Sequence, residues 1–157
     1  MKPNIGISEK NLSGITTLLS SVLSNNMTLY IKTRKYHWNV TGENFMELHQ
    51  LFEVQYKQLE KSIDEIAERI SKLGGNTIGT MKEFSELSSL EEAPGNYPPA
   101  IDMIVDLLKD HETVIIQLRK YIAECTDGLE DAGTADFLIG LLKEHETISW
   151  TLRRYLN

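Results

Sequence analysis

Apolar side chains recur at helical spacing along most of the chain and predict four long helices. The first helix is expected from about Ser8 to Trp38 and the second from about residue 44 to residue 73. A third helix is expected to open at Pro98-Pro99, because proline suits the first turn of a helix, and a fourth follows the segment 126–134. The pattern therefore predicts an all-α fold built as a four-helix bundle. The apolar positions that carry it are Leu12, Ile15, Leu18, Leu19, Val22, Leu23, Leu29, Tyr30, Phe45, Leu48, Phe52, Leu59, Ile63, Ile66, Ile70, Leu73, Ile101, Ile104, Leu108, Ile115, Leu118, Ile122, Leu138, Leu141, Ile148, Leu152 and Tyr155.

Glycine and proline divide these helices from one another. Gly42 interrupts the apolar pattern after the first helix, and Gly74-Gly75 is placed as a C-terminal cap of the second. The pattern weakens from residue 76 to residue 99, where MKEFSEL (81–87) predicts a short extra helix inside a long crossover. Such a connection lets the second and third long helices run parallel. We expect one domain over residues 1–157, with residues 1–8 as a short N-terminal arm.

The third and fourth long helices resemble each other in sequence. HETVIIQLRKYI (111–122) recurs as HETISWTLRRYL (145–156), a shift of 34 residues. A tetratricopeptide array has this period, but its consensus residues are missing and the segment recurs once. We interpret the two segments as bundle helices of similar pattern, with a relic of duplication as the open alternative.

Composition indicates a soluble globular protein. Of the 157 residues, 41% are hydrophobic and 25% are charged, and no apolar run approaches the length of a membrane span. The N-terminal MKPNIGISEK lacks the apolar core of a signal peptide, and one cysteine, Cys125, cannot form an internal disulfide. We therefore expect a cytoplasmic protein. The net charge of −7 disfavours general affinity for nucleic acid and is compatible with attracting cations.

Five side chains between residues 37 and 68 could bind a transition metal. His37 and His49 flank the predicted turn at Gly42, so in an antiparallel hairpin they fall at similar heights. Asp64 and Glu68 are four residues apart and share one face of the second helix. Imidazole and carboxylate together suit iron, zinc or manganese. Glu53 is the fifth candidate.

Helix length prevents one chain from completing this site. His49 and Asp64 are fifteen residues apart on one helix, which is about 22 Å along its axis. Two copies of the helix packed antiparallel about a two-fold axis near Tyr56 and Lys57 would bring the two groups together. A two-fold contact is self-complementary and would create two identical sites. Each site would combine His37 and His49 of one chain with Asp64 and Glu68 of the other.

Each candidate alone has an ordinary structural interpretation. Asp64 and Glu68 alone suggest a solvated helix face, Glu53 alone a surface charge, and Trp38 a packed aromatic at a helix end. The combination with two paired histidines favours metal binding.

His111 and His145 lie on apolar seams, where a histidine is more often a hydrogen-bonded core residue than a metal ligand. A di-iron site inside the bundle needs a Glu-x-x-His motif, and no histidine of this chain has it. The residues three positions before the four histidines are Arg34, Met46, Leu108 and Leu142.

HWNVTGENFMELHQLFE, followed by DEIAERISKLGG, closely resembles the Dps miniferritins, the DNA-binding proteins from starved cells. The resemblance covers nearly the whole chain, including the short middle helix and the closing WTLRRYL. The ligand pattern of the family is His, His at +12, an acid at +16, Asp at +27 and Glu at +31. Counted from His37, these positions hold His49, Glu53, Asp64 and Glu68. Glu53 departs from the Asp that is commoner in the family.

The resemblance implies a ferritin-like four-helix bundle that assembles into a hollow shell of twelve subunits. It implies ferroxidase sites at two-fold interfaces, where Fe(II) is oxidised, usually with hydrogen peroxide, before the Fe(III) mineral is stored inside. By analogy His37, His49, Asp64 and Glu68 bind one iron, and Glu53 helps to hold a second metal. Trp38 is expected to intercept stray oxidising equivalents. Asp131 and Asp136 are candidates for an iron pore at a three-fold axis. No organic cofactor is expected.

The rival function is DNA compaction, as the family name suggests. The arm carries only Lys2 and Lys10, offset by Glu9, and twelve copies of a chain with charge −7 should be repelled by DNA. We therefore expect DNA binding to be weak or absent, unless it uses divalent ions or a local patch such as Lys32, Arg34 and Lys35. A third alternative, a helical scaffold without chemistry, would make the five ligand matches coincidental.

Overall fold

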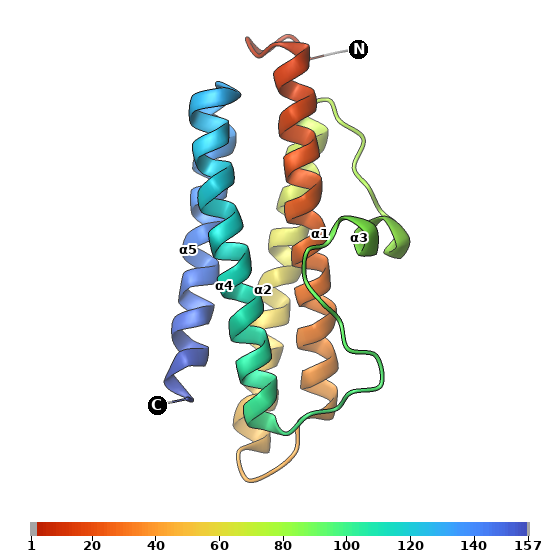
Figure 1. The fold of residues 1–157 in the computed structure, drawn as a ribbon, viewed down its shortest axis with the longest axis vertical. Coiled ribbons are helices and arrows are strands. Elements are labelled where there is room, and N and C mark those ends of the chain that lie inside the picture. Colours follow the sequence, from red (N-terminus) through yellow and green to blue (C-terminus); the bar gives the residue numbers. More distant parts are fainter. Residues whose placement is uncertain (1–2, 157) are drawn as a thin grey trace.

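The computed structural model describes residues 3–156 and shows four long helices in one bundle, with a short fifth helix outside it (Figure 1). The predicted all-α fold, with an extra short helix in the crossover, is confirmed. Met1, Lys2 and Asn157 lie outside the described residues, and the expectations for Lys2 and for the start of the arm lie outside them too. The helices are α1 (Glu9–Asn39), α2 (Phe45–Lys72), α3 (Met81–Leu87), α4 (Ala100–Ala123) and α5 (Ala132–Arg154), with a π-helical turn η1 (Glu124–Gly128).

Glycines make possible the sharp turns of the chain at the two ends of α2. Gly42, between α1 and α2, has φ of 112°, a conformation that side chains with a Cβ rarely adopt. At the other end Gly74 has φ of 83°, and the Gly75 amide donates to the carbonyl oxygen of Ile70 at 3.0 Å. This is the hydrogen-bond pattern of a Schellman cap, as the glycine pair predicted. Both ends of the metal-candidate helix are therefore fixed by the local sequence.

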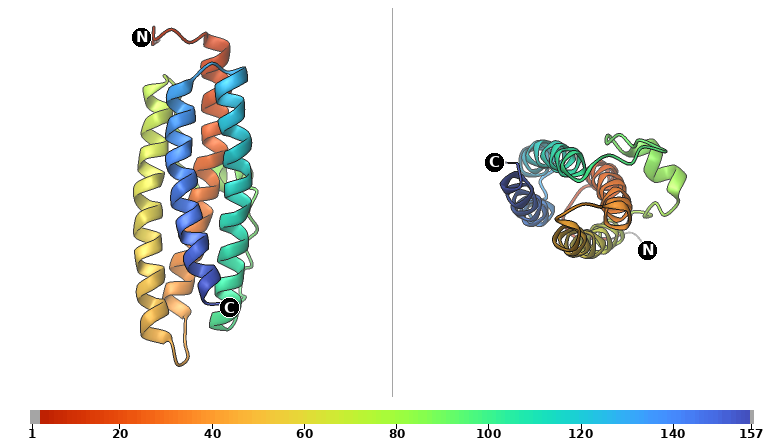
Figure 2. Two further views of the ribbon diagram at one scale, coloured as in Figure 1. Left: turned by 90° about the vertical axis from the view of Figure 1, so that its left-hand side faces the viewer. Right: turned by 90° about the horizontal axis from the view of Figure 1, so that it is seen from below.

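The crossover returns the chain along the length of the bundle, so that α2 and α4 run parallel (Figure 1). Seen from the end, α3 lies outside the four-helix layer (Figure 2). Polar side chains of α1 hold this connection. The amide of Asn25 accepts from the Ser89 backbone at 2.8 Å, and Thr28 donates to the hydroxyl of Ser88 at 2.9 Å. The buried ammonium of Lys32 donates to the carbonyl oxygen of Glu91 at 3.0 Å.

The core lies between the four long helices and is formed by most of the apolar positions that the sequence pattern identified, together with Met103, Leu107 and Val114 of α4, which the predicted heptad missed. Phe45 and Ile101 were also expected on the apolar face, but they are exposed. Fully burying such a side chain contributes about 1.5–3 kcal/mol relative to leaving it exposed. The largest fully buried side chains are Phe52, Ile15, Leu19, Leu23, Leu29, Leu59, Ile66, Ile70, Met103, Ile104, Leu107 and Leu118.

Helices α4 and α5 are antiparallel neighbours (Figure 2). Side chains of their repeated segments contact each other, including His111 with His145. Glu112 pairs with Arg153 at 2.8 Å, and the repeat-related Glu146 pairs with Arg119 at 2.5 Å. The two similar segments therefore form two matching ion pairs, each joining a glutamate of one segment to an arginine of the other.

The connection between α4 and α5 differs from the expectation. The sequence suggested a linker at 126–134, whereas the π-helical turn continues α4 to Gly128 and α5 begins at Ala132. Asp131 explains the early start, because its side chain caps the helix by accepting from the Thr134 amide at 3.0 Å.

Candidate metal centre

His37 and His49 meet where the α1–α2 hairpin turns. Their rings are stacked, with centroids 3.8 Å apart and an angle of 23° between the planes. The Nδ1 of His37 donates to the carbonyl oxygen of His49 at 2.8 Å, and the Nδ1 of His49 donates to the carbonyl oxygen of His37 at 2.9 Å. The prediction that the two histidines fall at similar heights is confirmed.

These two hydrogen bonds prepare both rings for a metal. A carbonyl oxygen only accepts, so each Nδ1 must carry the proton, and each Nε2 of the neutral ring keeps its lone pair. Hydrogen bonding of the second ring nitrogen is what normally fixes the tautomer and orientation of a metal-binding histidine. The pair is also held rigidly, since the His37 side chain is buried and His49 is half-buried. The hairpin therefore presents two oriented nitrogen donors.

Glu53 lies one turn after His49 on the same helix. Its carboxylate is ion-paired with Lys57 at 2.5 Å. The hydrogen bond and the charge of Lys57 hold the pKa of Glu53 below its usual value, and the nearby rings of His37 and His49 act in the same direction. Glu53 is thus an ionised acid beside the histidine pair, with one oxygen engaged by Lys57.

Asp64 and Glu68 lie toward the other end of α2, and both are exposed. Lys72 binds Glu68 at 2.8 Å, and this hydrogen bond lowers the pKa of the Glu68 carboxyl. Asp64 borders a surface groove between α1 and α2 that Met27, Tyr30 and Ala67 also line. Because α2 is one uninterrupted helix, the separation of about 22 Å from His49 holds.

The structure therefore separates the candidate ligands into two groups. Among residues 3–156 of a single chain, no three histidine, cysteine or acidic side chains come together as a group that could hold a metal ion. His37 and His49 are one group, and Asp64 and Glu68 are the other, at a distance that no metal ion spans.

Tyr56 lies against the histidine pair and Arg34 lies against Tyr56 and Trp38, two contacts that sequence reasoning did not identify. The ring of Tyr56 meets the ring of His37 edge-on, with centroids 5.2 Å apart. The guanidinium of Arg34 lies over the rings of Tyr56 at 4.7 Å and Trp38 at 5.3 Å, and donates to the hydroxyl of Tyr30 at 2.5 Å. The spacing of four residues along α1 could have revealed this contact with Trp38. Trp38 itself is 63% exposed.

The two pore candidates have different surroundings. Asp131 is buried and caps α5, and the guanidinium of Arg69 pairs with its carboxylate at 3.2 Å. Burial raises the pKa of the Asp131 carboxyl, but its hydrogen bonds to Thr134 and the charge of Arg69 outweigh this effect and leave the pKa below its usual value. This carboxylate has a structural role and is not free to line a pore. Asp136 lies one turn into α5 and is exposed.

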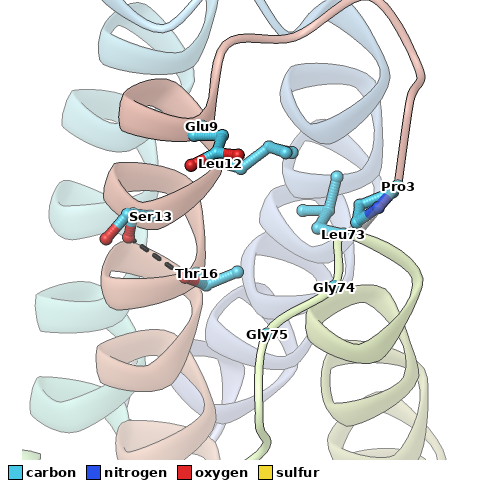
Figure 3. A pocket seen from close by; sticks show the side chains of 8 residues that line it. All are labelled: Pro3, Glu9, Leu12, Ser13, Thr16, Leu73, Gly74 and Gly75. Atoms are coloured by element: carbon cyan, nitrogen blue, oxygen red, sulfur yellow. Dashed lines mark hydrogen bonds between the residues drawn. The ribbon is translucent and has the colours of Figure 1, made fainter. Parts of the chain in front are cut away.

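The bundle end opposite the histidine hairpin has a pocket that does not belong to the metal site. It is lined by Pro3, Leu12 and Leu73, with Ser13 and Thr16 joined by a hydrogen bond on one side (Figure 3). A Cβ added at Gly74 would lie 2.6 Å from the Pro3 ring, so the N-terminal segment packs closely on the glycine turn. The lining contains one acid, Glu9, and no histidine or cysteine.

Comparison with known proteins identifies the family. Residues 16–157 match the model of the ferritin-like domain. The chain is 44% identical to an uncharacterized low temperature-induced protein of Nostoc, over 85% of this chain and 74% of that protein. It is 36% identical to DNA protection during starvation protein 2 of Bacillus anthracis, over 78% of this chain and 82% of that protein.

A solved Dps structure has the same fold over almost the entire chain. The Dps protein of Vibrio cholerae, described as a member of a superfamily of ferritin-like diiron-carboxylate proteins, superposes with a TM-score of 0.93 at 26% identity. The superposition covers 99% of this chain and 97% of that one. None of the helices within residues 3–156 combines the length and apolar character needed to cross a bilayer. On its sequence match, its relatives and its fold, the chain belongs to the Dps family within the ferritin-like superfamily.

Proposed function

We propose that this protein oxidises and stores iron, using ferroxidase sites that are completed between two subunits. The observation that carries the proposal is the pair of oriented Nε2 donors on His37 and His49, at one end of a continuous helix whose other end bears Asp64 and Glu68. One chain supplies two complementary half-sites that cannot meet within it.

A two-fold dimer resolves this separation. With two copies of α2 antiparallel about an axis near Tyr56 and Lys57, His37 and His49 of one subunit meet Asp64 and Glu68 of its partner. The surface near this axis has apolar area to bury, because Val54 is 64% exposed and Met27 and Ala67 line the adjacent groove. Each dimer then has two sites.

The ligand set suits Fe(II) as the substrate. Two neutral nitrogens and two carboxylates neutralise the charge of a divalent ion and provide the donors that iron accepts. Hydrogen peroxide takes up two electrons, so one molecule converts two Fe(II) to two Fe(III) and, with two protons, becomes two waters. Paired one-electron oxidations therefore consume peroxide without releasing hydroxyl radical.

The finer assignments extend this proposal. Glu53 contributes to a second metal position if an incoming cation displaces Lys57 from its carboxylate. Trp38, which follows His37 in the sequence and is exposed, is suited to donating electrons to stray oxidant. Twelve subunits form the hollow shell that holds the Fe(III) mineral, and Asp136 remains the candidate for its pore.

DNA binding is the second candidate, because relatives carry the name DNA protection during starvation protein. The structure weakens the local patch on which it would depend. Lys32 is buried against Asp110 and Asp106, with the Asp106 contact at 2.9 Å. Lys35 donates to the carbonyl oxygen of Ala93 at 3.0 Å. With a net charge of −7 per chain, we propose that DNA is bound weakly or not at all.

Iron oxidation by ligand variants tests the proposed function. Fe(II) and hydrogen peroxide are mixed anaerobically with the His49→Ala or the Glu68→Ala variant. The rate of rapid Fe(II) oxidation should fall by at least about tenfold, because removing a direct ligand should cost no less than removing a residue that only supports a ligand. Glu86→Ala is the matched control, because Glu86 also pairs with a lysine on its own helix, Lys82, but lies on α3. Iron-soaked crystals should show anomalous density beside both Nε2 atoms. Full activity in both ligand variants, with no density at the histidines, would contradict the proposal.

A further inference from the structure

A chain of hydrogen bonds crosses the bundle core from α4 through α5 to α1. The Nδ1 atoms of His111 and His145 are 2.8 Å apart, and the Nε2 of His145 lies 3.2 Å from the Oδ1 of Asn26. The amide nitrogen of Asn26 donates to the carbonyl oxygen of Val22 at 2.9 Å. His111, His145 and Asn26 are fully or almost fully buried, so the expectation of hydrogen-bonded core histidines is confirmed.

The donor and acceptor of each hydrogen bond in this chain follow from the Val22 carbonyl at its end. The carbonyl of Val22 must accept, so the Asn26 Oδ1 faces His145 and accepts from its Nε2–H. The Nδ1 of neutral His145 then has a lone pair and accepts from the Nδ1–H of His111. Burial lowers the pKa of both histidines, which agrees with two neutral rings. The Nε2 of His111 is left as an acceptor with no partner among the described residues.

Two other buried side chains also have polar atoms without a hydrogen-bond partner among the described residues. Gln55 on α2 is 3% exposed and Ser149 on α5 is 1% exposed. Neither the amide oxygen and nitrogen of Gln55 nor the hydroxyl of Ser149 has a hydrogen-bond partner within residues 3–156. Buried polar groups without a partner are rare in native proteins, because each loses its hydrogen bonds to water without replacing them.

Contacts between neighbouring helices place these groups at one height in the bundle. Lys32 of α1 contacts Asp110 of α4, so in these antiparallel helices position 31 lies opposite His111. His37 of α1 stacks on His49 of α2, so six residues further along α2 Gln55 also lies opposite position 31. Gln55 also lies opposite the turn of α5 that holds Ser149, which is bracketed by the contacts Ser62–Glu144 and Glu47–Tyr155. Ser149 follows His145 by one helical turn.

The chemistry of this layer selects a neutral ligand that both donates and accepts. His111 Nε2 and Gln55 Oε1 need donors, whereas Gln55 Nε2 needs an acceptor and the Ser149 hydroxyl can serve either way. A divalent cation does not suit the layer, because burying its charge requires anionic partners. The buried acids of residues 3–156 are Asp110, which is paired with Lys32, and Asp131, which caps α5.

We propose that the bundle core of each subunit contains a buried water site bounded by Gln55, His111 and Ser149. Water has two donors and two acceptor lone pairs, which match the unpartnered atoms of the layer, and buried waters typically satisfy such groups. The site is separate from the iron ligands: its side chains point to the interior, whereas Asp64 and Glu68 are exposed.

A high-resolution crystal structure of the assembled, iron-free protein tests the site. We expect ordered density about 2.7–3.2 Å from His111 Nε2, within hydrogen-bond distance of Gln55 or Ser149, and without anomalous signal after a zinc or iron soak. A rotated Gln55 amide that donates directly to His111, with no density between them, would overturn the proposal. Anomalous density would overturn it equally, because it would show a cation.

Oxygen-17 magnetic relaxation dispersion provides a second readout in solution. The Gln55→Leu variant should lose about one long-lived water per subunit relative to wild type, since the site loses two of its polar atoms. Gln58→Leu is the matched control on α2, because the Gln58 side chain is half-buried and is not among the unpartnered groups. An unchanged number of long-lived waters in Gln55→Leu would contradict the proposal.

Discussion

Acidification should destabilise the fold through the buried histidine pair. Burial lowers the pKa of His145 to about 4, whereas a histidine in the unfolded chain titrates near its ordinary value of 6.5. As the pH falls below 6.5, residue His145 binds a proton in the unfolded chain, whereas in the folded protein it stays neutral until about pH 4. Acid therefore favours unfolding. At about 1.4 kcal/mol per pH unit, this residue costs about 2 kcal/mol of stability per subunit at pH 5. His111 acts in the same direction.

The assay is denaturant unfolding of the iron-free protein at pH 7 and pH 5, at one fixed subunit concentration. In His145→Gln, the glutamine amide can still donate to Asn26 and accept from His111, but this position no longer titrates. The variant should therefore lose about 2 kcal/mol less than wild type between the two pH values. His49→Gln is the control, because it leaves the buried pair intact. Equal losses in wild type and His145→Gln would refute the account of the pair.

Three further predictions concern single residues and DNA. Asp131→Ala should lower the free energy of unfolding by about 1–3 kcal/mol in denaturant titrations, because it removes the α5 cap from Thr134 and the carboxylate that pairs with Arg69. Lys32→Met should cost about 3–5 kcal/mol, since it leaves Asp110 buried without its cation; a loss under 1 kcal/mol would contradict this. Plasmid mobility in gels should not change at physiological salt without divalent ions, and a strong, salt-sensitive shift would support the DNA-binding alternative.

The sequence was informative where one helix or one turn determines the outcome. The apolar spacing of α2 and its glycine cap at Gly74 are local, so their prediction succeeded. The positions of His37 and His49 relative to Gly42 sufficed to predict their pairing, because a hairpin fixes the register of its two helices.

The parts that were not predicted depend on contacts between distant segments. Tyr56 reaches His37 only through the packing of α1 on α2, and Arg69 reaches Asp131 only because α5 returns beside α2. The sequence likewise could not show that the carboxylate of Asp131 is buried, caps α5 and pairs with Arg69. The direct contact of His111 with His145 likewise depends on the register of two helices that the sequence alone leaves open.

The central claim is that each iron site takes ligands from two subunits, and mixed assembly tests it most directly. One variant combines His37→Ala with His49→Ala, and the other combines Asp64→Ala with Glu68→Ala. Each alone should lose rapid Fe(II) oxidation, because every site lacks half of its ligands.

Equal amounts of the two variants are then co-assembled, and subunit exchange is verified by mass spectrometry of tagged chains. Random mixing makes half of the dimers mixed, and each mixed dimer has one intact site of its two, so about a quarter of wild-type activity should return. If all ligands came from one chain, no mixture could rebuild a site. Activity that stays at background after proven exchange would contradict the shared-site account.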